Sequence, residues 1–283
     1  MATVGLLHPG EMGAAVGGCL VSVGHEVLWD PAGRSRASTG RALAAELTGV
    51  TLDRLVAKSS VIFSICPPHA VLDIAHQVAG AGYTGYYVDA NAISVATAEQ
   101  VSAVVTAGGA TYVDGGIIGS PPEDAGHTRL YLSGPQADKI RPLFSRSRLD
   151  ARIAEGPPYA ASSVKMAYAA WTKGSSALLL AARALARASG VERTLLTEWS
   201  LSQQALGRQS EGAAGSAAAK GWRWVAEMEE IAASMAAAGL PAGFHEAAAD
   251  IYDRASRAEA PTSRRPAAAE QPSTLDSIMS ALM

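Results

Sequence analysis

The stretch TVGLLHPGEMGAAVGGCL, residues 3–20, decides the fold of the first half of the chain. Residues 3–8 form a short apolar run typical of a buried strand, and residues 11–24 have the small apolar side chains of a helix packed on a sheet. Between them, residues 8–13 contain two of the three glycines of the pattern G-x-G-x-x-G, with His8 in the first position. A strand, a glycine turn and a helix in this order are typical of a domain that binds a dinucleotide.

Strands and helices continue to alternate along the first half of the chain. Residues 93–107 are predicted to form a helix. Apolar runs bounded by Gly, Pro or Ser predict strands at residues 25–30, 59–66, 85–90, 110–119 and 128–134. Alternating strands and helices imply a largely parallel sheet, so the predicted fold class is α/β with an N-terminal Rossmann doubly wound sheet.

The second half of the chain has the pattern of helices alone. No proline interrupts the run from Pro158 to Gly190, which predicts a helix of about thirty residues, roughly 45 Å long. Further helices are predicted at residues 191–206, 221–239 and 241–258, and a short amphipathic helix at 274–283. The predicted domains are a Rossmann NAD(P)-binding domain (1–157), an all-helical substrate and dimerisation domain (158–260) and a flexible tail (261–283).

Composition excludes several classes of function. A formal net charge of −3 gives no electrostatic reason to expect nucleic acid as a partner. No apolar run approaches the ~20 residues that span a membrane, and no basic segment typical of a signal peptide begins the chain. Cys19 and Cys66 lie in apolar segments without metal-ligand spacing, which predicts reduced thiols, a cytoplasmic location and no metal site.

The glycine turn is the predicted phosphate-binding site. The first amides of the following helix have no partner within the helix, and together with the helix dipole they favour a pyrophosphate. Pro9 has a fixed φ, so the His8–Pro9 pair can form the turn without the first glycine. The predicted cofactor contacts here are His8, Pro9, Gly10, Glu11 and Met12.

Two features after the second strand compete over the choice of cofactor. Asp30 lies where an acidic residue would bind the ribose hydroxyls of NAD. Arg34, Ser35 and Arg36 follow it, and a loop with two guanidiniums and a hydroxyl suits the 2′-phosphate of NADP. Because Pro31 follows Asp30, that carboxylate can instead cap the turn. We favour NADP, with NAD as the alternative.

Four motifs in order resemble the β-hydroxyacid dehydrogenases, a family that includes 6-phosphogluconate and 3-hydroxyisobutyrate dehydrogenases and the related imine reductases. They are GLLHPGEMG at residues 5–13, SICPPHAV at 64–71, VDANAIS at 88–94 and YVDGGIIGSPP at 112–122. The likeness covers residues 3–260, and the chain is most similar to a branch with a C-terminal domain like that of phosphogluconate dehydrogenases. The resemblance implies an oxidoreductase that acts on a small molecule, as a homodimer joined through its helical domain.

The resemblance also assigns residues to the cofactor and the substrate. It implies that Cys66 and Pro67 pass beside the nicotinamide, and that Asn91 contacts cofactor and substrate. Ile118 stands where the family has the serine that binds the substrate carboxylate, so this role passes to Ser120 or to backbone amides nearby. The implied substrate contacts are Asn91, Gly116, Gly119 and Ser120.

Lys165 is the predicted catalytic residue. It falls at the lysine of the family signature G-x-G-x-x-x-K-x-x-N-N, with Tyr168 and Ala169 in place of the asparagines. It also lies in an apolar helical stretch, where burial and a neighbouring cationic nicotinamide would favour the neutral amine. Such an amine can take the hydroxyl proton as a hydride leaves the carbon. The alternative is a lysine that extends from a packed helix to the solvent.

Three residues are predicted to lie near this lysine. Tyr168, three residues on, shares its helix face, so its hydroxyl is expected near the reacting oxygen as a second catalytic residue. Ser162, three residues before, lies on the same face and is a predicted substrate contact. His245 begins a later helix and is a further predicted substrate contact.

Three functions follow from these observations. The first is an NADP-dependent dehydrogenase or reductase of a hydroxy acid or a related alcohol or carbonyl. The second is an imine reductase, which would reduce C=N on the same fold, and Lys165 argues against it because imine reductases usually lack a lysine at this place. The third is a nucleotide-binding sensor without turnover, which the replaced asparagines and the altered glycine turn leave open.

Overall fold

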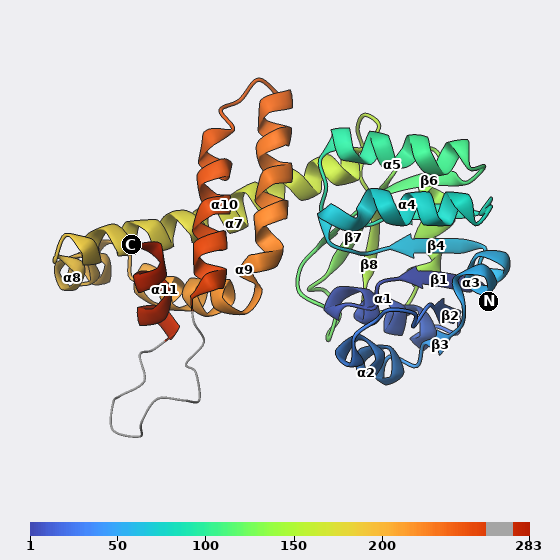
Figure 1. Ribbon diagram of the computed structural model, residues 1–283, viewed down its shortest axis with the longest axis horizontal. Helices are drawn as coiled ribbons and strands as arrows, with labels where there is room; N and C mark the ends of the chain where they lie inside the picture. The colour runs from blue at the N-terminus through green and yellow to red at the C-terminus, as the bar shows by residue number, and fades with distance from the viewer. Residues whose placement is uncertain (259–273) are drawn as a thin grey trace. The chain divides into compact units, whose positions relative to one another are not determined.

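The computed structural model describes residues 1–258 and 274–283 (Figure 1). Its chain divides into two compact units, residues 1–167 and residues 168–283. The first unit holds the sheet, and the described part of the second consists of helices. The division falls within a long helix, at residue 167 rather than at the predicted limit of 157. The predicted domain limits concern independent folding and stay a prediction.

The described residues of the first unit form one sheet of eight strands. In space the strands follow the order β3-β2-β1-β4-β5-β6-β7-β8, and all neighbours are parallel except β6 and β7. This is the predicted Rossmann sheet, extended by β7 and β8, which are parallel to each other and antiparallel to the other strands. The strands are β1 (Thr3–Leu7), β2 (Glu26–Trp29), β3 (Thr48–Gly49), β4 (Val61–Ser64), β5 (Tyr86–Asp89), β6 (Thr111–Ile118), β7 (Arg129–Ser133) and β8 (Asp150–Ile153).

Helices cover both faces of the sheet, as a doubly wound fold requires. On one face lie α1 (Glu11–Ser22), α2 (Arg36–Ala44), α6 (Ala137–Ile140) and the 3-10 turn η2 (Arg141–Phe144). On the other lie α3 (Leu52–Lys58), α4 (Val71–Gly80) and α5 (Val95–Ala107), and Figure 1 shows α4 and α5 side by side. Each face therefore has its own apolar core, which is why the strands are nearly continuous runs of buried residues.

The order of the strands fixes where a ligand can bind. The chain moves outward from β1 through β2 to β3, and then crosses to β4 on the other side of β1. In open parallel sheets ligands bind beyond the carboxyl ends of the strands at such a reversal. Here those ends lead into His8 after β1 and Ile65 after β4, so the topology points to the predicted glycine turn.

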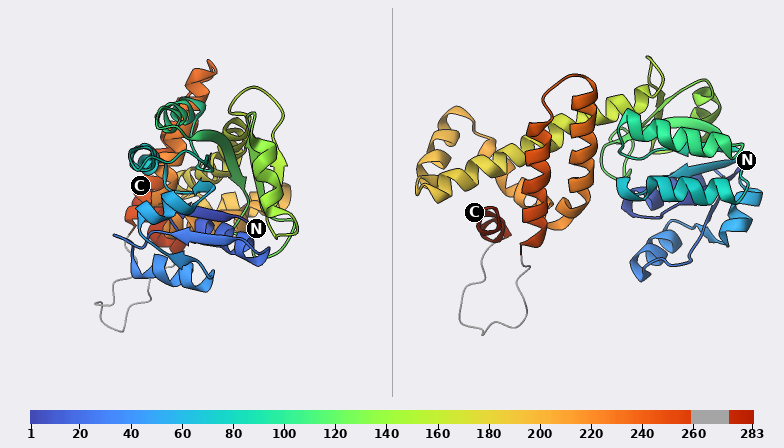
Figure 2. Two further views of the ribbon diagram at one scale, coloured as in Figure 1. Left: turned by 90° about the vertical axis from the view of Figure 1, so that its right-hand side faces the viewer. Right: turned by 45° about the horizontal axis from the view of Figure 1, so that its top comes forward.

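The helical unit is built on long helices. The helix predicted from residue 158 forms as α7 (Ala160–Ala188), which begins in the first unit and continues into the second. Helix α8 (Glu192–Ser202) follows it, and α9 (Leu206–Ala237) packs beside α10 (Gly243–Arg257) in the views of Figures 1 and 2. Helix α9 begins before the predicted residue 221. The high helix propensity of the alanines in residues 213–219 offsets the low propensity of Gly212 and Gly215.

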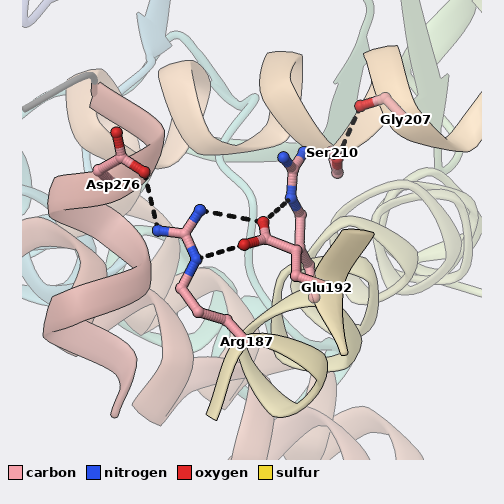
Figure 3. Close-up of polar contacts among 6 residues, drawn as sticks. Arg187, Glu192, Gly207, Ser210 and Asp276 are labelled. Carbon is pink, nitrogen blue, oxygen red and sulfur yellow. Dashed lines mark hydrogen bonds and ion pairs between the residues drawn. The ribbon is translucent and has the colours of Figure 1, made fainter. Parts of the chain in front are cut away.

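The end of the chain contains the predicted short amphipathic helix, and the flexibility of residues 261–283 stays a prediction. Residues 259–273 of that segment lie outside the described residues. Residues 274–282 form helix α11 (Thr274–Leu282), with Ile278 and Met279 fully buried. Figure 3 shows the Asp276 carboxylate of α11 accepting a hydrogen bond from Arg187, at 2.8 Å. The apolar burial and this ion pair hold the amphipathic helix against the helical unit.

The start of α1 gives the first testable prediction. A Cβ atom at Gly13 would collide with the carbonyl oxygen of His8, whereas at Gly18, in the same helix, it would lie 3.6 Å from the nearest atom. We expect Gly13→Ala to lower the free energy of unfolding by about 1–3 kcal/mol, because backbone must move. The matched control Gly18→Ala should leave it unchanged or raise it by about 0.5–1 kcal/mol. Urea unfolding measures both, and equal stabilities would contradict the close approach.

Candidate functional site

The glycine turn keeps the conformation of the complete fingerprint although its first glycine is missing. His8 takes that place with φ of 65°, in the left-handed region that favours glycine. Gly10 caps α1 with extended backbone, and a Cβ atom there would meet nothing within 4 Å. Arg41 Nε donates to the carbonyl oxygen of the buried Pro9 at 3.3 Å, which holds the turn. The amides of Glu11 and Met12 therefore begin α1 beside open space, as a phosphate site requires.

The side chain of Arg34 lies against this turn. Its Nη1 atom is 2.8 Å from Nε2 and 2.9 Å from Nδ1 of His8. Burial, with the positive charges of Arg34 and then His69 nearby, lowers the pKa of His8 to about 4, so the imidazole is neutral at pH 7. The glycine turn is therefore in direct contact with Arg34, the residue predicted to bind the 2′-phosphate.

The two other residues of the cofactor-selecting loop are engaged locally. Asp30 Oδ1 accepts a hydrogen bond from the amide of Ala32 at 2.9 Å, so this carboxylate does cap its own turn. Ser35 is the N-cap of α2, and its hydroxyl accepts from the amide of Ser38 at 3.2 Å. A contact of Ser35 with the cofactor stays a prediction, and sequence reasoning missed its capping role.

A row of buried polar side chains crosses the middle of the sheet. The register pairs Ser64 of β4 with Asp89 of β5, Asp89 with Asp114 of β6, and Asp114 with Ser133 of β7. Each of the four is at most 2% exposed. Buried polar groups are costly unless hydrogen-bonded, so the partners of this row decide what it does.

Asn91 joins the row to the loop after β4. Its Nδ2 donates to Ser64 Oγ at 3.0 Å and to Asp89 Oδ1 at 2.6 Å, while its Oδ1 accepts from the backbone amide of Cys66 at 2.6 Å. Asn91 is buried, with both amide hydrogens in use. It therefore positions the Cys66–Pro67 segment, and a direct contact with cofactor or substrate stays a prediction.

Asp89 has an unusual protonation equilibrium. Burial, opposed by the hydrogen bonds from Asn91 and reinforced by the negative charge of Asp114, raises its pKa to about 7. Burial also raises the pKa of the Cys66 thiol to about 12, so this cysteine is protonated at pH 7. Cys66 therefore fits a wall of the site better than a nucleophile.

Asp114 anchors the first turn of α7. Its carboxylate accepts from Ser162 Oγ at 2.5 Å, from the Ser162 amide at 3.1 Å and from Ser133 Oγ at 2.6 Å. Ser133 Oγ in turn accepts from the amide of Ala161 at 3.2 Å. The Asp114 carboxylate and Ser133 Oγ thus each satisfy one of the amides that a helix start leaves unpaired. Ser162 is 1% exposed and bound to Asp114, so it anchors the helix, and its contact with substrate stays a prediction.

Lys165 is carried by this anchored turn. A Cβ atom at Gly116 of β6 would lie 2.7 Å from the carbonyl oxygen of Ala161 and 2.9 Å from Lys165 Cβ. Gly116 therefore allows α7 to approach the sheet, and a side chain there would displace the lysine. Lys165 is partly buried, and Tyr168, one turn later, is 48% exposed. The catalytic roles of both stay predictions.

The remaining predicted substrate residues lie in two places. Gly119 has φ of 118°, and a Cβ atom there would collide with the carbonyl oxygen of His127, so this turn requires glycine. The carbonyl oxygen of the exposed Ser120 accepts from Thr128 Oγ1 at 2.5 Å. His245 lies in the helical unit, where it is 5% exposed and its Nε2 is 3.3 Å from the carbonyl oxygen of Ala170. His245 is therefore packed within the helical unit, and its contact with substrate stays a prediction.

The structure adds residues that sequence reasoning did not single out. They are Ser64, Asp89, Asp114 and Ser133, the polar row. A signal for them was present, because the apolar runs VIFS (61–64), YYVD (86–89), TYVD (111–114) and RLYLS (129–133) each end on a serine or an aspartate. A polar residue at the same place in neighbouring strands predicts a shared row.

Two findings concern other kinds of site. Within residues 1–258 and 274–283, no three His, Cys, Asp or Glu side chains are grouped to hold a metal ion. In the same residues, no helix combines the length and the apolar character needed to cross a membrane.

The family comparison concerns the helical unit. Residues 186–255, from the end of α7 to α10, match the family described as "domain of unknown function (DUF1932)". No curated protein matches the chain in sequence.

Solved structures with the same fold cover nearly the whole chain. A conserved protein of unknown function, described as structurally similar to 3-hydroxyacid dehydrogenases, is 25% identical over 89% of this chain and 97% of its own, with a TM-score of 0.65. The 3-hydroxyisobutyrate dehydrogenase of Mycobacterium tuberculosis with L-serine is 20% identical over 90% and 93%, with a TM-score of 0.67. The reductive aminase of Aspergillus terreus with NADPH and ethyl levulinate is 19% identical over 91% and 94%, with a TM-score of 0.57.

These findings define the class of protein. The chain has the fold of the 3-hydroxyacid dehydrogenases and imine reductases, with a DUF1932 match in its helical part. The resemblance to the β-hydroxyacid dehydrogenase superfamily, inferred from four motifs and the lysine position, is confirmed.

Asp89 gives a prediction about pH. Its pKa is about 7 in the folded protein, against 3.8 for an ordinary aspartate, so between these values the folded state binds more protons than the unfolded state. Stability should therefore fall as the pH rises from about 4 to about 7. Asp89→Asn removes this contribution while keeping an oxygen that accepts from Asn91.

Thermal unfolding between pH 5 and pH 8 tests this. We expect the midpoint of the wild type to fall more over this range than that of Asp89→Asn. The exposed Asp124 provides a matched control, since Asp124→Asn should keep the wild-type dependence. Parallel curves for wild type and Asp89→Asn would show that Asp89 does not titrate there.

Proposed function

We propose that the protein is an NADP-dependent oxidoreductase that transfers a hydride between the nicotinamide and a hydroxy acid or a related alcohol or carbonyl, with Lys165 as the general acid/base. The observation that carries this is the packing of the anchored first turn of α7 on Gly116, beside a sheet whose other functional loops have the geometry of a dinucleotide site. The shared fold with dehydrogenases and reductases supports the class of reaction.

The residues present fit a dinucleotide. The left-handed His8, the open space at Gly10 and the exclusion of any side chain at Gly13 together form a phosphate cradle. The amides of Glu11 and Met12 would hold the pyrophosphate, since the amide of Gly10 already donates to the carbonyl oxygen of His8 at 2.8 Å. The Cys66–Pro67 segment, held by Asn91, would lie along the nicotinamide.

The choice of NADP rests on the loop after β2. The Asp30 carboxylate is occupied by its own turn, whereas the Arg34 guanidinium lies at the edge of the phosphate turn. A guanidinium suits a phosphate dianion, whereas a ribose diol would need the Asp30 carboxylate, whose Oδ1 accepts from the amide of Ala32. The NADPH complex of the Aspergillus reductive aminase is consistent with this choice.

The bound nicotinamide supplies the hydride acceptor or donor. The Lys165 amine takes the hydroxyl proton of the substrate during oxidation and returns it to the carbonyl oxygen during reduction. Asp114 and Gly116 hold the lysine backbone in place during both directions. Tyr168 supplies a hydroxyl one helical turn away, which can hydrogen-bond near the same oxygen.

Replacement of Lys165 tests this mechanism. Lys165→Met should keep the affinity for NADP(H) within a few-fold and lower turnover by about 10²–10⁴, the usual range for a lost general acid/base. Lys165→Arg should also fail, because a guanidinium does not deprotonate. Cofactor affinity is measured by nicotinamide fluorescence and turnover on the best substrate of a carbonyl and alcohol panel.

The exposed Lys58 at the end of α3 gives the control, since Lys58→Met should retain full turnover. Near-normal turnover in Lys165→Met would place the proton transfer elsewhere, with Tyr168 as the next residue to replace. It would also favour the second candidate function.

That second candidate is an imine reductase. The fold shared with imine reductases and reductive aminases favours it, and Lys165 argues for alcohol and carbonyl chemistry instead. Turnover with an imine panel but not with carbonyls would select it. Tight binding of NADP(H) without turnover on either panel would indicate a nucleotide-binding sensor.

We further propose a homodimer joined through α7. Trp171, Leu178 and Leu185 recur every seven residues, which places them along one face of the helix, and they are 76%, 55% and 69% exposed. Such a stripe of large apolar side chains is typical of a surface that another chain covers. A second copy of this chain is the partner that the family resemblance implies.

Light scattering at micromolar concentration tests the dimer. We expect twice the mass of the chain for the wild type and the monomer mass for Leu178→Glu, because a charge would be buried in the interface. Trp222 of α9 is 54% exposed and lies outside the stripe, so Trp222→Glu should stay dimeric. A monomeric wild type would contradict the proposal.

A further inference from the structure

His8 occupies a backbone position that costs it free energy. Its φ of 65° is open to glycine without strain, and a residue with a Cβ atom adopts it at a cost of about 1–2 kcal/mol. Glycine would form the same turn without this cost. A strained residue beside a functional loop is a reason to ask what its side chain does.

The imidazole of His8 contacts one nitrogen of Arg34. Nη1 of Arg34 is 2.8 Å from Nε2 and 2.9 Å from Nδ1 of His8. Burial and the charges of Arg34 and His69 keep the pKa of His8 near 4, so at neutral pH one ring nitrogen carries a lone pair. The guanidinium can therefore donate to a neutral acceptor.

A neutral hydrogen-bond partner leaves the positive charge of Arg34 available to a ligand. A carboxylate in this place would pair with Arg34 and cancel its charge, whereas an imidazole orients the group and leaves the charge available. Arg34 Nε is buried and has no hydrogen-bond partner among the described residues. Arg34 as a residue is partly exposed, so an anion can reach it from the solvent.

We infer that the His8 imidazole holds the Arg34 guanidinium in position for the 2′-phosphate of NADP, and that His8 is therefore a specificity-determining residue for the cofactor. This rests on the proposed NADP dependence. The gain comes from pre-organisation, because the long Arg34 side chain then loses less rotamer freedom when the phosphate arrives. The imidazole acts through Arg34 and is a positioning residue.

The test compares the affinities of NADPH and NADH, measured by nicotinamide fluorescence, in the wild type and three variants. The wild type should bind NADPH at least about tenfold more tightly than NADH, and Arg34→Ala should remove most of this preference. His8→Gly fits the backbone without strain, so it should fold, and its NADH affinity is measured beside its NADPH affinity. It should reduce the NADPH preference by about threefold to tenfold, the range of one hydrogen bond to a charged group.

Two further variants test whether the His8 imidazole acts through Arg34. In His8→Gly with Arg34→Ala, the NADPH preference should be no lower than in Arg34→Ala alone, since one residue acts through the other. His8→Asn accepts the left-handed backbone but has a shorter side chain, so it should behave like His8→Gly. The exposed Arg54 of α3 is the control, and Arg54→Ala should keep the wild-type preference.

The pH dependence distinguishes a positioning role from direct contact. Between pH 7 and pH 9 the NADPH preference should be constant, because His8, beside the cationic Arg34 and near His69, is already neutral. A preference that falls with rising pH in the wild type, and is flat in His8→Gly, would indicate an imidazolium bound directly to the phosphate and would overturn the inference.

The outcomes also separate this inference from the proposed function. If the wild type shows no preference for NADPH, the NADP proposal fails. If the wild type prefers NADPH and Arg34→Ala loses that preference while His8→Gly keeps it in full, the NADP proposal stands and the role of His8 is overturned. Independent losses from the two single variants that add in the double variant would overturn it as well.

Discussion

The hydrogen bonds between the buried Asp114 carboxylate and the first turn of α7 connect the sheet to the helix that carries Lys165. A buried carboxylate is stable only when its oxygens are hydrogen-bonded, and a helix start leaves amides that need acceptors. The Asp114 carboxylate and the start of α7 therefore supply each other's hydrogen-bond partners. Ser133 Oγ also donates to the carboxylate. In the neighbouring strands a second hydrogen-bonded group, Asn91 with Ser64 and Asp89, holds the loop at Cys66, so two adjacent buried groups order two parts of the candidate site.

The fold could be predicted from sequence because its signals are local. The run TVGLLH and the glycines after it define a strand, a turn and a helix, and the uninterrupted stretch from Pro158 defines α7. Two features escaped prediction because they depend on distant residues. The antiparallel pairing of β6 with β7 is set by sheet partners, and the docking of α11 depends on Arg187, far away in the chain.

The candidate site also has some features that could be predicted from sequence and others that could not. The roles of Gly10 and Gly13 could be predicted because glycines at this spacing, between a strand and a helix, are typical of a phosphate-binding turn. The tasks of Ser162 and Asn91 were not, because they depend on Asp114 and Asp89 in neighbouring strands, which no local pattern brings together. The left-handed backbone of His8 could be anticipated from the missing glycine, whereas its contact with Arg34 joins loops from two strands and required the structure.

A crystal structure of the protein with NADPH tests the account most directly. We expect the pyrophosphate on the amides of Glu11 and Met12, the 2′-phosphate on Arg34, and the nicotinamide along Cys66 and Pro67 with Lys165 Nζ within reach of the reacting carbon's oxygen. A dinucleotide bound elsewhere, or a nicotinamide ring turned away from Lys165, would contradict it.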